Sequence, residues 1–186
     1  MSLYLGDTRI SSTIEKEYIG IPLEVSAQGQ LQRPTKSFSW SLPSNATSIT
    51  TSALLQNAFY NCTGLTSVNL SSLTTVSGNS VMAYTFANCT NLINVDLSNL
   101  TTISGSSALM FAFEFCKNLA TLYFPSLTST SFGSNTNQFN NMLNGVIGCT
   151  VHFPSNLQSV IGSWSSVTSG FSGTNTTVLF DLPATT

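Results

Sequence analysis

The chain has 186 residues, of which 41% are hydrophobic and only 6% are charged, and its formal net charge is −2. The length and the hydrophobic content suffice for one domain with a sizeable core. The small net charge offers no electrostatic footprint for nucleic acid, and no stretch approaches the length of an apolar membrane span, so neither nucleic-acid binding nor a membrane span is expected.

The first 36 residues differ in composition from the rest, because they hold eight of the twelve charged side chains. We therefore expect a docking arm or cap over residues 1–36 and a separate folded region over 37–186. The opening "LYLGDTRI" places two short apolar runs around Gly6-Asp7, which predicts an N-terminal hairpin. "MSLYLGDTRISS" lacks the basic start and long apolar run of a signal peptide. This favours a protein that is not secreted by a signal, or one whose signal has been removed.

A long repeat follows this segment. "NCTGLTSVNLSSLTTVSG" (61–78) returns as "NCTNLINVDLSNLTTISG" (88–105), displaced by 27 residues without a gap. A third copy, "FCKNLATLYFPSLTS" (115–129), fixes the pattern as C-x-x-L-x-x-Φ-x-Φ, where Φ is apolar. The alternation after the first Leu predicts a short strand with its apolar residues pointing inward. Spacings of 28 and 29 residues extend the pattern to six strands. Such a period predicts a leucine-rich-repeat solenoid with about six short parallel strands on one face.

Alignment of the six strands predicts two buried columns, in which Val68, Val95 and Leu122 stack as neighbours. The first column is Trp40, Val68, Val95, Leu122, Val151 and Phe180, and the second is Leu42, Leu70, Leu97, Phe124, Phe153 and Leu182. On the returns between strands, the apolar triplets Leu55/Met82/Leu109 and Phe59/Phe86/Phe113 recur at helical or turn-like spacing. This predicts turns, a short helix or a 3₁₀ turn on each return. The longer segment 132–148 is expected to bulge from the solenoid.

Three of the four cysteines share one repeat position, since Cys62, Cys89 and Cys116 are 27 residues apart. Stacked coils could bring them near disulfide distance, but a ladder of buried free thiols is the favoured interpretation. Cys149 does not fall in this register. With no C-x-x-C and a single histidine, neither a metal site nor a cofactor is expected.

The stretches "FYNCTGLTSVNL", "FANCTNLINVDL" and "FEFCKNLATLYF" resemble the BspA-like leucine-rich repeats, in which an aromatic-x-x-Cys-x-x-Leu start precedes a short strand. The resemblance covers roughly residues 38 to 184. It implies bacterial surface adhesins that bind a host or a matrix, and related proteins of bacteriophages. The coils here are longer than is usual in that family. "MSLYLGDTRI" also resembles the opening of tail and fibre proteins from phages of gut bacteria, which implies a location in the virion.

The outward residue of each strand belongs to a polar row: Ser41, Asn69, Asp96, Tyr123, His152 and Asp181. Neighbours in this row are expected about 4.8 Å apart. We predict that Asn69, Asp96, Tyr123, His152 and Asp181 bind a protein or glycan on a bacterial or host surface; the alternative is a merely solvated sheet face. His152 beside Asp181 fits the orientation of an imidazole by a carboxylate. Neither a nucleophile elbow nor a concavity that excludes water accompanies the pair, so no catalytic residue and no enzyme is expected.

Three functions remain open. In the first, the chain is a tail- or fibre-associated virion protein that docks through residues 1–36 to other subunits and presents its repeat face for host attachment. In the second, it is a bacterial cell-surface adhesin. In the third, it is a virion connector or decoration protein without a ligand.

Overall fold

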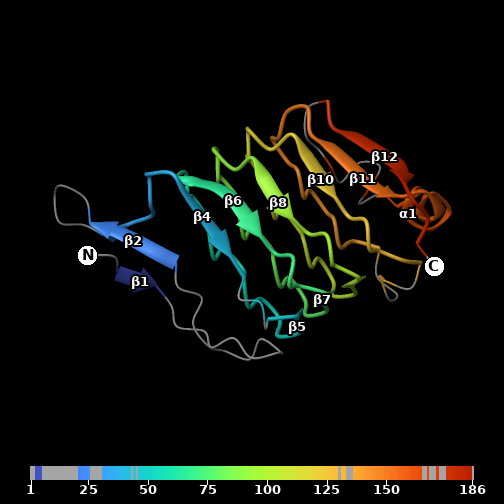
Figure 1. Ribbon diagram of the computed structural model, residues 1–186, viewed down its shortest axis with the longest axis horizontal. Coiled ribbons are helices and arrows are strands. Elements are labelled where there is room, and N and C mark those ends of the chain that lie inside the picture. The colour runs from blue at the N-terminus through green and yellow to red at the C-terminus, as the bar shows by residue number, and fades with distance from the viewer. Residues whose placement is uncertain are drawn as a thin grey trace.

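The computed structural model describes residues 3–5, 21–25, 31–42, 44, 46–129, 131–132, 136–164, 167, 171 and 175–185 of the chain. Six strands lie side by side along the long axis of the molecule, in the order of the sequence (Figure 1). They are β4 (Phe38–Ser41), β6 (Leu65–Asn69), β8 (Asn94–Asp96), β10 (Thr121–Tyr123), β11 (Thr150–Pro154) and β12 (Thr177–Leu182). Every paired neighbour among them is parallel. The predicted leucine-rich-repeat solenoid is confirmed.

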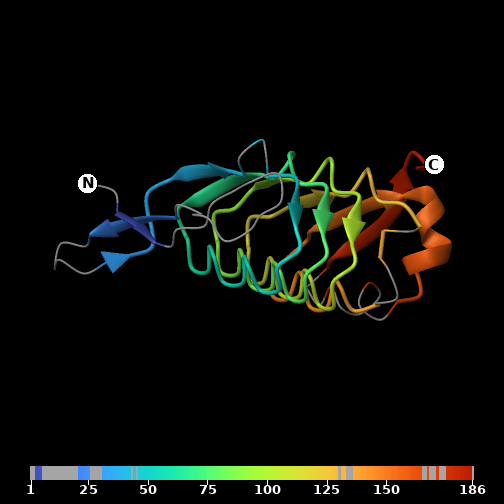
Figure 2. The ribbon, with the colours of Figure 1, turned by 90° about the horizontal axis from the view of Figure 1, so that it is seen from below.

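A second set of short strands follows the first at the point where a turn was expected. These strands are β5 (Ser48–Ile49), β7 (Thr75–Val76) and β9 (Thr102–Ile103), which pair in parallel. In each, a threonine or serine is half-buried and the following Ile or Val is fully buried. Figure 2 shows these three arrows in a row, roughly across the direction of the main strands. Each coil in this part of the molecule therefore has two sheet layers.

The returns of the first coils consist of turns, which is one of the predicted alternatives, and contain no helix. From residue 53 to 62, backbone N–H groups alternate between two kinds of acceptor. Ala58 N–H donates three residues back to Leu55 O at 3.0 Å, whereas Phe59 N–H donates to Thr85 O of the next coil at 2.8 Å. The same alternation recurs in the next return, and Figure 2 shows the returns as stacked zigzags. Spacings of four apolar residues fit a helix and a chain of turns equally well, so periodicity alone could not separate the two.

Every fourth residue of these returns has a positive φ. The repeating positions are Ala53/Ser80/Ser107, Asn57/Tyr84/Phe111 and Asn61/Asn88/Phe115, with φ between 54° and 62° except at Ser80, where it is 52°. Left-handed backbone is unfavourable for residues other than glycine, and asparagine tolerates it best. None of these residues is β-branched, because a β-branched side chain would be strongly strained at a positive φ. Asn61 and Asn88 thus owe their place to backbone geometry.

The solenoid interior is filled by columns that run from coil to coil. Phe59, Phe86 and Phe113 are fully buried, with ring centroids 5.4 and 5.5 Å apart along the stack. A second aromatic cluster occupies the later coils, where Phe124 lies 5.2 Å from Phe153 and 5.9 Å from Phe139. Segment 132–148 supplies part of this cluster. Its described residues do not bulge outward: Phe132 and Phe139 are buried, and Leu109 N–H donates to Gln138 O across the coils.

The two ends of the solenoid are closed differently. At the C-terminal end, the 3₁₀ helix η1 (Ser155–Leu157) and the helix α1 (Gln158–Ile161) precede β12. At the N-terminal end, β1 (Leu3–Leu5), β2 (Ile21–Val25) and β3 (Leu31–Gln32) form a separate antiparallel sheet. The predicted turn at Gly6-Asp7 lies outside the described residues.

Residues just after β3 complete the first coil. Arg33 Nη1 donates to Ala58 O at 2.9 Å. In the second coil, the equivalent carbonyl oxygen of Thr85 accepts a hydrogen bond from the backbone N–H of Phe59 in the first coil. Arg33 therefore replaces the donor that a preceding coil would supply. Gly64 N–H donates to Pro34 O, and a Cβ at Gly64 would collide with the carbonyl of Lys36, so the approach requires glycine.

Candidate binding face

The outward row predicted from the sequence is present, but it is divided into two parts. Asn69 is paired with Asp96 across β6 and β8, and Tyr123 is paired with His152 across β10 and β11. Between Asp96 and Tyr123 the main sheet is interrupted, because β8 and β10 belong to separate sheets. Regular spacing along the whole row was therefore a wrong expectation. The column of Val68, Val95 and Leu122 crosses the same interruption, so only Val68 and Val95 are ladder partners.

Asn69 and Asp96 have a structural role on the face. The Oδ1 atom of Asn69 accepts the backbone N–H of Ser71 at 2.8 Å, and Oδ1 of Asp96 accepts that of Ser98 at 3.0 Å. These are turns closed by a side chain, a common reason for Asn or Asp at the end of a strand. Each side chain keeps further hydrogen-bonding capacity and is exposed.

A shallow groove of about 320 Å³ lies at the interruption. Its wall on one side is formed by β8 and the residues after it, and on the other side by β10; the lining residues are Asn94, Val95, Asp96, Leu97, Ser98, Thr121 and Tyr123. Asn94, Ser98 and Thr121 belong to the columns that flank the outward row in the aligned strands. The groove itself was not predicted. The sequence feature that could have indicated the groove is the change from leucine to phenylalanine in the second buried column, between Leu97 and Phe124.

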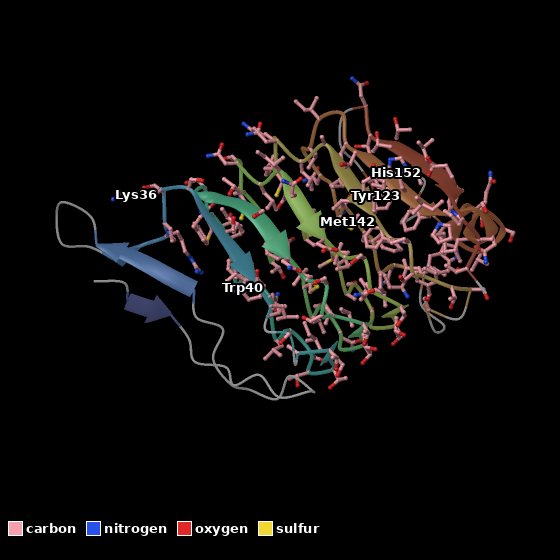
Figure 3. All side chains as sticks on the ribbon, viewed as in Figure 1. Lys36, Trp40, Tyr123, Met142 and His152 are labelled. Carbon is pink, nitrogen blue, oxygen red and sulfur yellow. The ribbon has the colours of Figure 1, made fainter. Side chains whose placement is uncertain are left out.

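Beside the groove, three side chains form a connected group. The rings of Tyr123 and His152 are stacked, with centroids 4.5 Å apart and planes 14° from parallel, and Figure 3 shows them next to each other. The Nδ1 atom of His152 lies 2.8 and 3.0 Å from the two carboxylate oxygens of Asp181. Because a carboxylate can only accept a hydrogen bond, Nδ1 of His152 carries a hydrogen and donates this bond to Asp181. The His152 side chain is only 14% exposed, and Tyr123 is 48% exposed.

The position of Asp181 differs from the predicted alignment. His152 is paired with Leu179, and a bulge between His152 and Pro154 brings Pro154 opposite Leu182. The first buried column therefore continues from Val151 to Val178 rather than to Phe180. The ring of Phe180 instead stacks 5.7 Å from that of Phe153, in the second column. Asp181 still reaches His152, so the predicted neighbourhood of the two is confirmed although the register is not.

The cysteine ladder is buried and reduced. All four thiols are free, and Sγ of Cys89 and Cys116 each donate at 3.1 Å to a carbonyl of the preceding coil. Burial raises the pKa of Cys62 to about 11 despite the nearby Arg33 guanidinium, and that of Cys149 to about 12. Burial also raises the pKa of Cys89 and Cys116 well above the ordinary range. These thiols are structural groups with little nucleophilic character.

Within the described parts of the chain, no cluster of three His, Cys, Asp or Glu side chains is placed to hold a metal ion. The described helices also include none with the length and apolar character needed to cross a membrane.

The stacked coils, the parallel strands with an outward polar row and the buried cysteine ladder define a leucine-rich-repeat solenoid. The BspA-type leucine-rich repeat matches residues 34–163 in six copies, so the chain belongs to this family. Membership suggests a binding or adhesin role, since the repeat fold is typically a binding scaffold rather than an enzyme. No curated protein and no solved structure is significantly similar to the chain.

Proposed function

We propose that the chain is a tail- or fibre-associated phage protein whose repeat face attaches the particle to a host surface. The observation that carries this proposal is the group formed by Tyr123, His152 and Asp181. Tyr123 exposes nearly half of its surface and is held rigid from behind by the His152 ring. Rigid exposed aromatic side chains are the commonest anchors of binding sites, because little conformational entropy is lost when they bind.

The distribution of charge supports a division of labour along the chain. Eight of the twelve charged residues lie in residues 1–36, whereas the strands of the face contain no Lys or Arg. Charge complementarity is suited to fixing the register with a particular protein partner, whereas a face rich in hydroxyls and amides, with two acidic residues and no Lys or Arg on its strands, suits polar ligands. In the proposal, residues 1–32, which hold six of these eight charged residues, dock to other subunits of the virion. Arg33 and Pro34 contact the first coil, so they are assigned to its cap.

A bacterial cell-surface adhesin is the second candidate, and the family assignment favours it directly. It uses the same face and differs in where the chain resides. The third candidate, a connector without a ligand, predicts that changes on the face have no effect on attachment.

The three candidates are separated by locating the protein and by replacing face residues. Mass spectrometry of purified particles should detect the chain if it is a virion protein, and surface labelling of bacteria should detect it if it is an adhesin. Purified protein should compete with particles for attachment to cells, and Tyr123→Ala should weaken that competition. Tyr60→Ala is the matched control, because Tyr60 is 38% exposed but lies on a return. If the unchanged protein does not compete with particles at all, only the connector remains; if it competes and both variants compete equally, Tyr123 is not the anchor.

A further inference from the structure

The interruption between β8 and β10 leaves backbone hydrogen-bonding groups without partners in the sheet. Leu70 N–H donates to the carbonyl of Asp96, so residue 96 faces β6 and its neighbour Val95 faces β10. Phe124 N–H donates to the carbonyl of His152, so Tyr123 faces β8 by the same alternation. No backbone hydrogen bond joins β8 to β10. The backbone polar groups of Val95 and Tyr123 therefore face the groove and are available to water or a ligand.

The groove is too narrow to admit an added strand. Insertion of a peptide strand between β8 and β10 would place these two strands about 9.6 Å apart, which is twice the normal spacing. Their Cα atoms instead approach to within 8 Å of each other. A ligand must therefore lie over the groove, in contact with the side chains that rise from its two walls.

The two walls differ in chemistry. Tyr123 has one ring face against His152, so its other face is turned toward β8 and the groove. Opposite it, Asn94 and Ser98 supply neutral donors and acceptors, and Asp96 keeps one carboxylate oxygen that is not used by the Ser98 turn. A flat aromatic face opposite a row of polar groups matches a pyranose ring, which has a C–H face and a hydroxyl rim.

Charge narrows the choice of sugar. Asp96 lines the groove, Asp181 contacts His152 behind Tyr123, and the strands of the face carry no Lys or Arg. Anionic sugars such as uronic acids would meet like charge without a cationic partner. We propose that the groove between β8 and β10 binds a neutral hexopyranose unit of a surface glycan, stacked on Tyr123 and hydrogen-bonded to Asn94, Asp96 and Ser98. This inference rests on the proposed attachment function and names its ligand class.

The test titrates the full-length protein with methyl β-D-glucopyranoside and methyl β-D-galactopyranoside, with saturation-transfer NMR as the readout. A hexopyranose unit has about 12 non-hydrogen atoms, and at about 0.3 kcal/mol of binding free energy per atom its Kd is on the order of 1–10 mM. Tyr123→Ala should weaken binding at least about tenfold, whereas Tyr123→Phe should retain it because the ring remains. Tyr60→Ala should bind as the unchanged protein does. Thermal unfolding checks that each variant is folded.

Four outcomes overturn the inference: neither glycoside binds, Tyr123→Phe loses binding as Tyr123→Ala does, Tyr60→Ala weakens binding equally, or methyl β-D-glucuronide binds as tightly. The failure of the attachment function is distinguished by the competition assay on cells. If Tyr123→Ala weakens attachment while no glycoside binds, attachment stands and the ligand of the face is a protein surface rather than a sugar.

Discussion

The ladder of buried thiols makes the stability of the solenoid sensitive to alkali. The pKa of Cys89 rises from its ordinary value of 9.0 to well above that range, because burial disfavours the thiolate. A raised folded-state pKa contributes stability that is fully present below the unfolded pKa and is lost as the pH rises above it. In the unfolded chain the thiol ionises near pH 9, whereas in the folded chain it stays protonated.

The loss can be calculated for each thiol. Ionisation of one thiol stabilises the unfolded state by about 0.4 kcal/mol at pH 9 and by about 1.4 kcal/mol at pH 10, whereas it stabilises the native state by almost nothing. All four cysteines are buried with raised pKa values, so together they cost about 5 to 6 kcal/mol at pH 10. This is comparable to the whole stability of an ordinary domain. The solenoid is therefore expected to lose much of its stability between pH 9 and pH 10.

Cys89→Ser isolates one of these thiols. Its hydroxyl keeps a donor for the carbonyl of Phe59 but places a more polar atom in an apolar stack, so we expect a loss of about 1–2 kcal/mol at pH 7. Serine does not ionise, so the variant escapes about 1.4 kcal/mol of the loss at pH 10. The difference between the two proteins in urea unfolding should therefore shrink or vanish between pH 7 and pH 10. A difference that stays constant over this range would refute the reasoning.

Three further changes test the cap, the returns and the core. Arg33→Ala should destabilise the first coil by about 1–3 kcal/mol in urea unfolding, because it leaves the carbonyl of Ala58 without its charged donor, and an unchanged midpoint would contradict the cap. Asn88→Val should cost more than about 2 kcal/mol because a β-branched residue is strained at a φ of 61°, whereas Asn88→Gly should be nearly neutral; equal effects would argue against the left-handed turn. Phe124→Leu restores leucine to the second column and should allow β8 and β10 to pair. Hydrogen exchange should then show that the Tyr123 amide is more protected. Unchanged exchange would show that the Phe124 side chain does not cause the groove.

The fold could be predicted because each coil repeats one set of apolar positions. The columns through Val68 and Leu70 depend only on strand alternation and a constant period, and both can be read from the sequence. The returns could not be assigned, since a spacing of four is shared by helices and by consecutive turns. What separates them is the positive φ at every fourth residue, and its strongest markers in the sequence are the asparagines at positions 57, 61, 88 and 141 and Gly145.

The sequence predicted which residues lie on the candidate face, but it did not predict the groove or the register of β12. The alignment identified Tyr123, His152 and Asp181 as neighbours because equal offsets place equivalent residues on adjacent strands. It could not detect that His152 pairs with Leu179 rather than with Asp181, because a two-residue shift keeps each side chain on the same side of the sheet. The 29-residue spacing between the aligned strand segments therefore could not determine which residues of β12 pair with those of β11.

The groove and the buried core have a common origin in the change between Leu97 and Phe124. Up to Leu97 the second column is aliphatic, and β6 pairs with β8 in one continuous register. From Phe124 onward the column is aromatic, and its rings pack against Phe139, which the longer return of the fourth coil inserts into the interior. We infer that the larger ring below β10 needs more room than a leucine and displaces β10 from the ladder of β8. The same displacement turns one face of Tyr123 toward open space. A repeat with uniform coils would present a flat sheet, and it is the irregular coil that gives this face a place to hold a ligand.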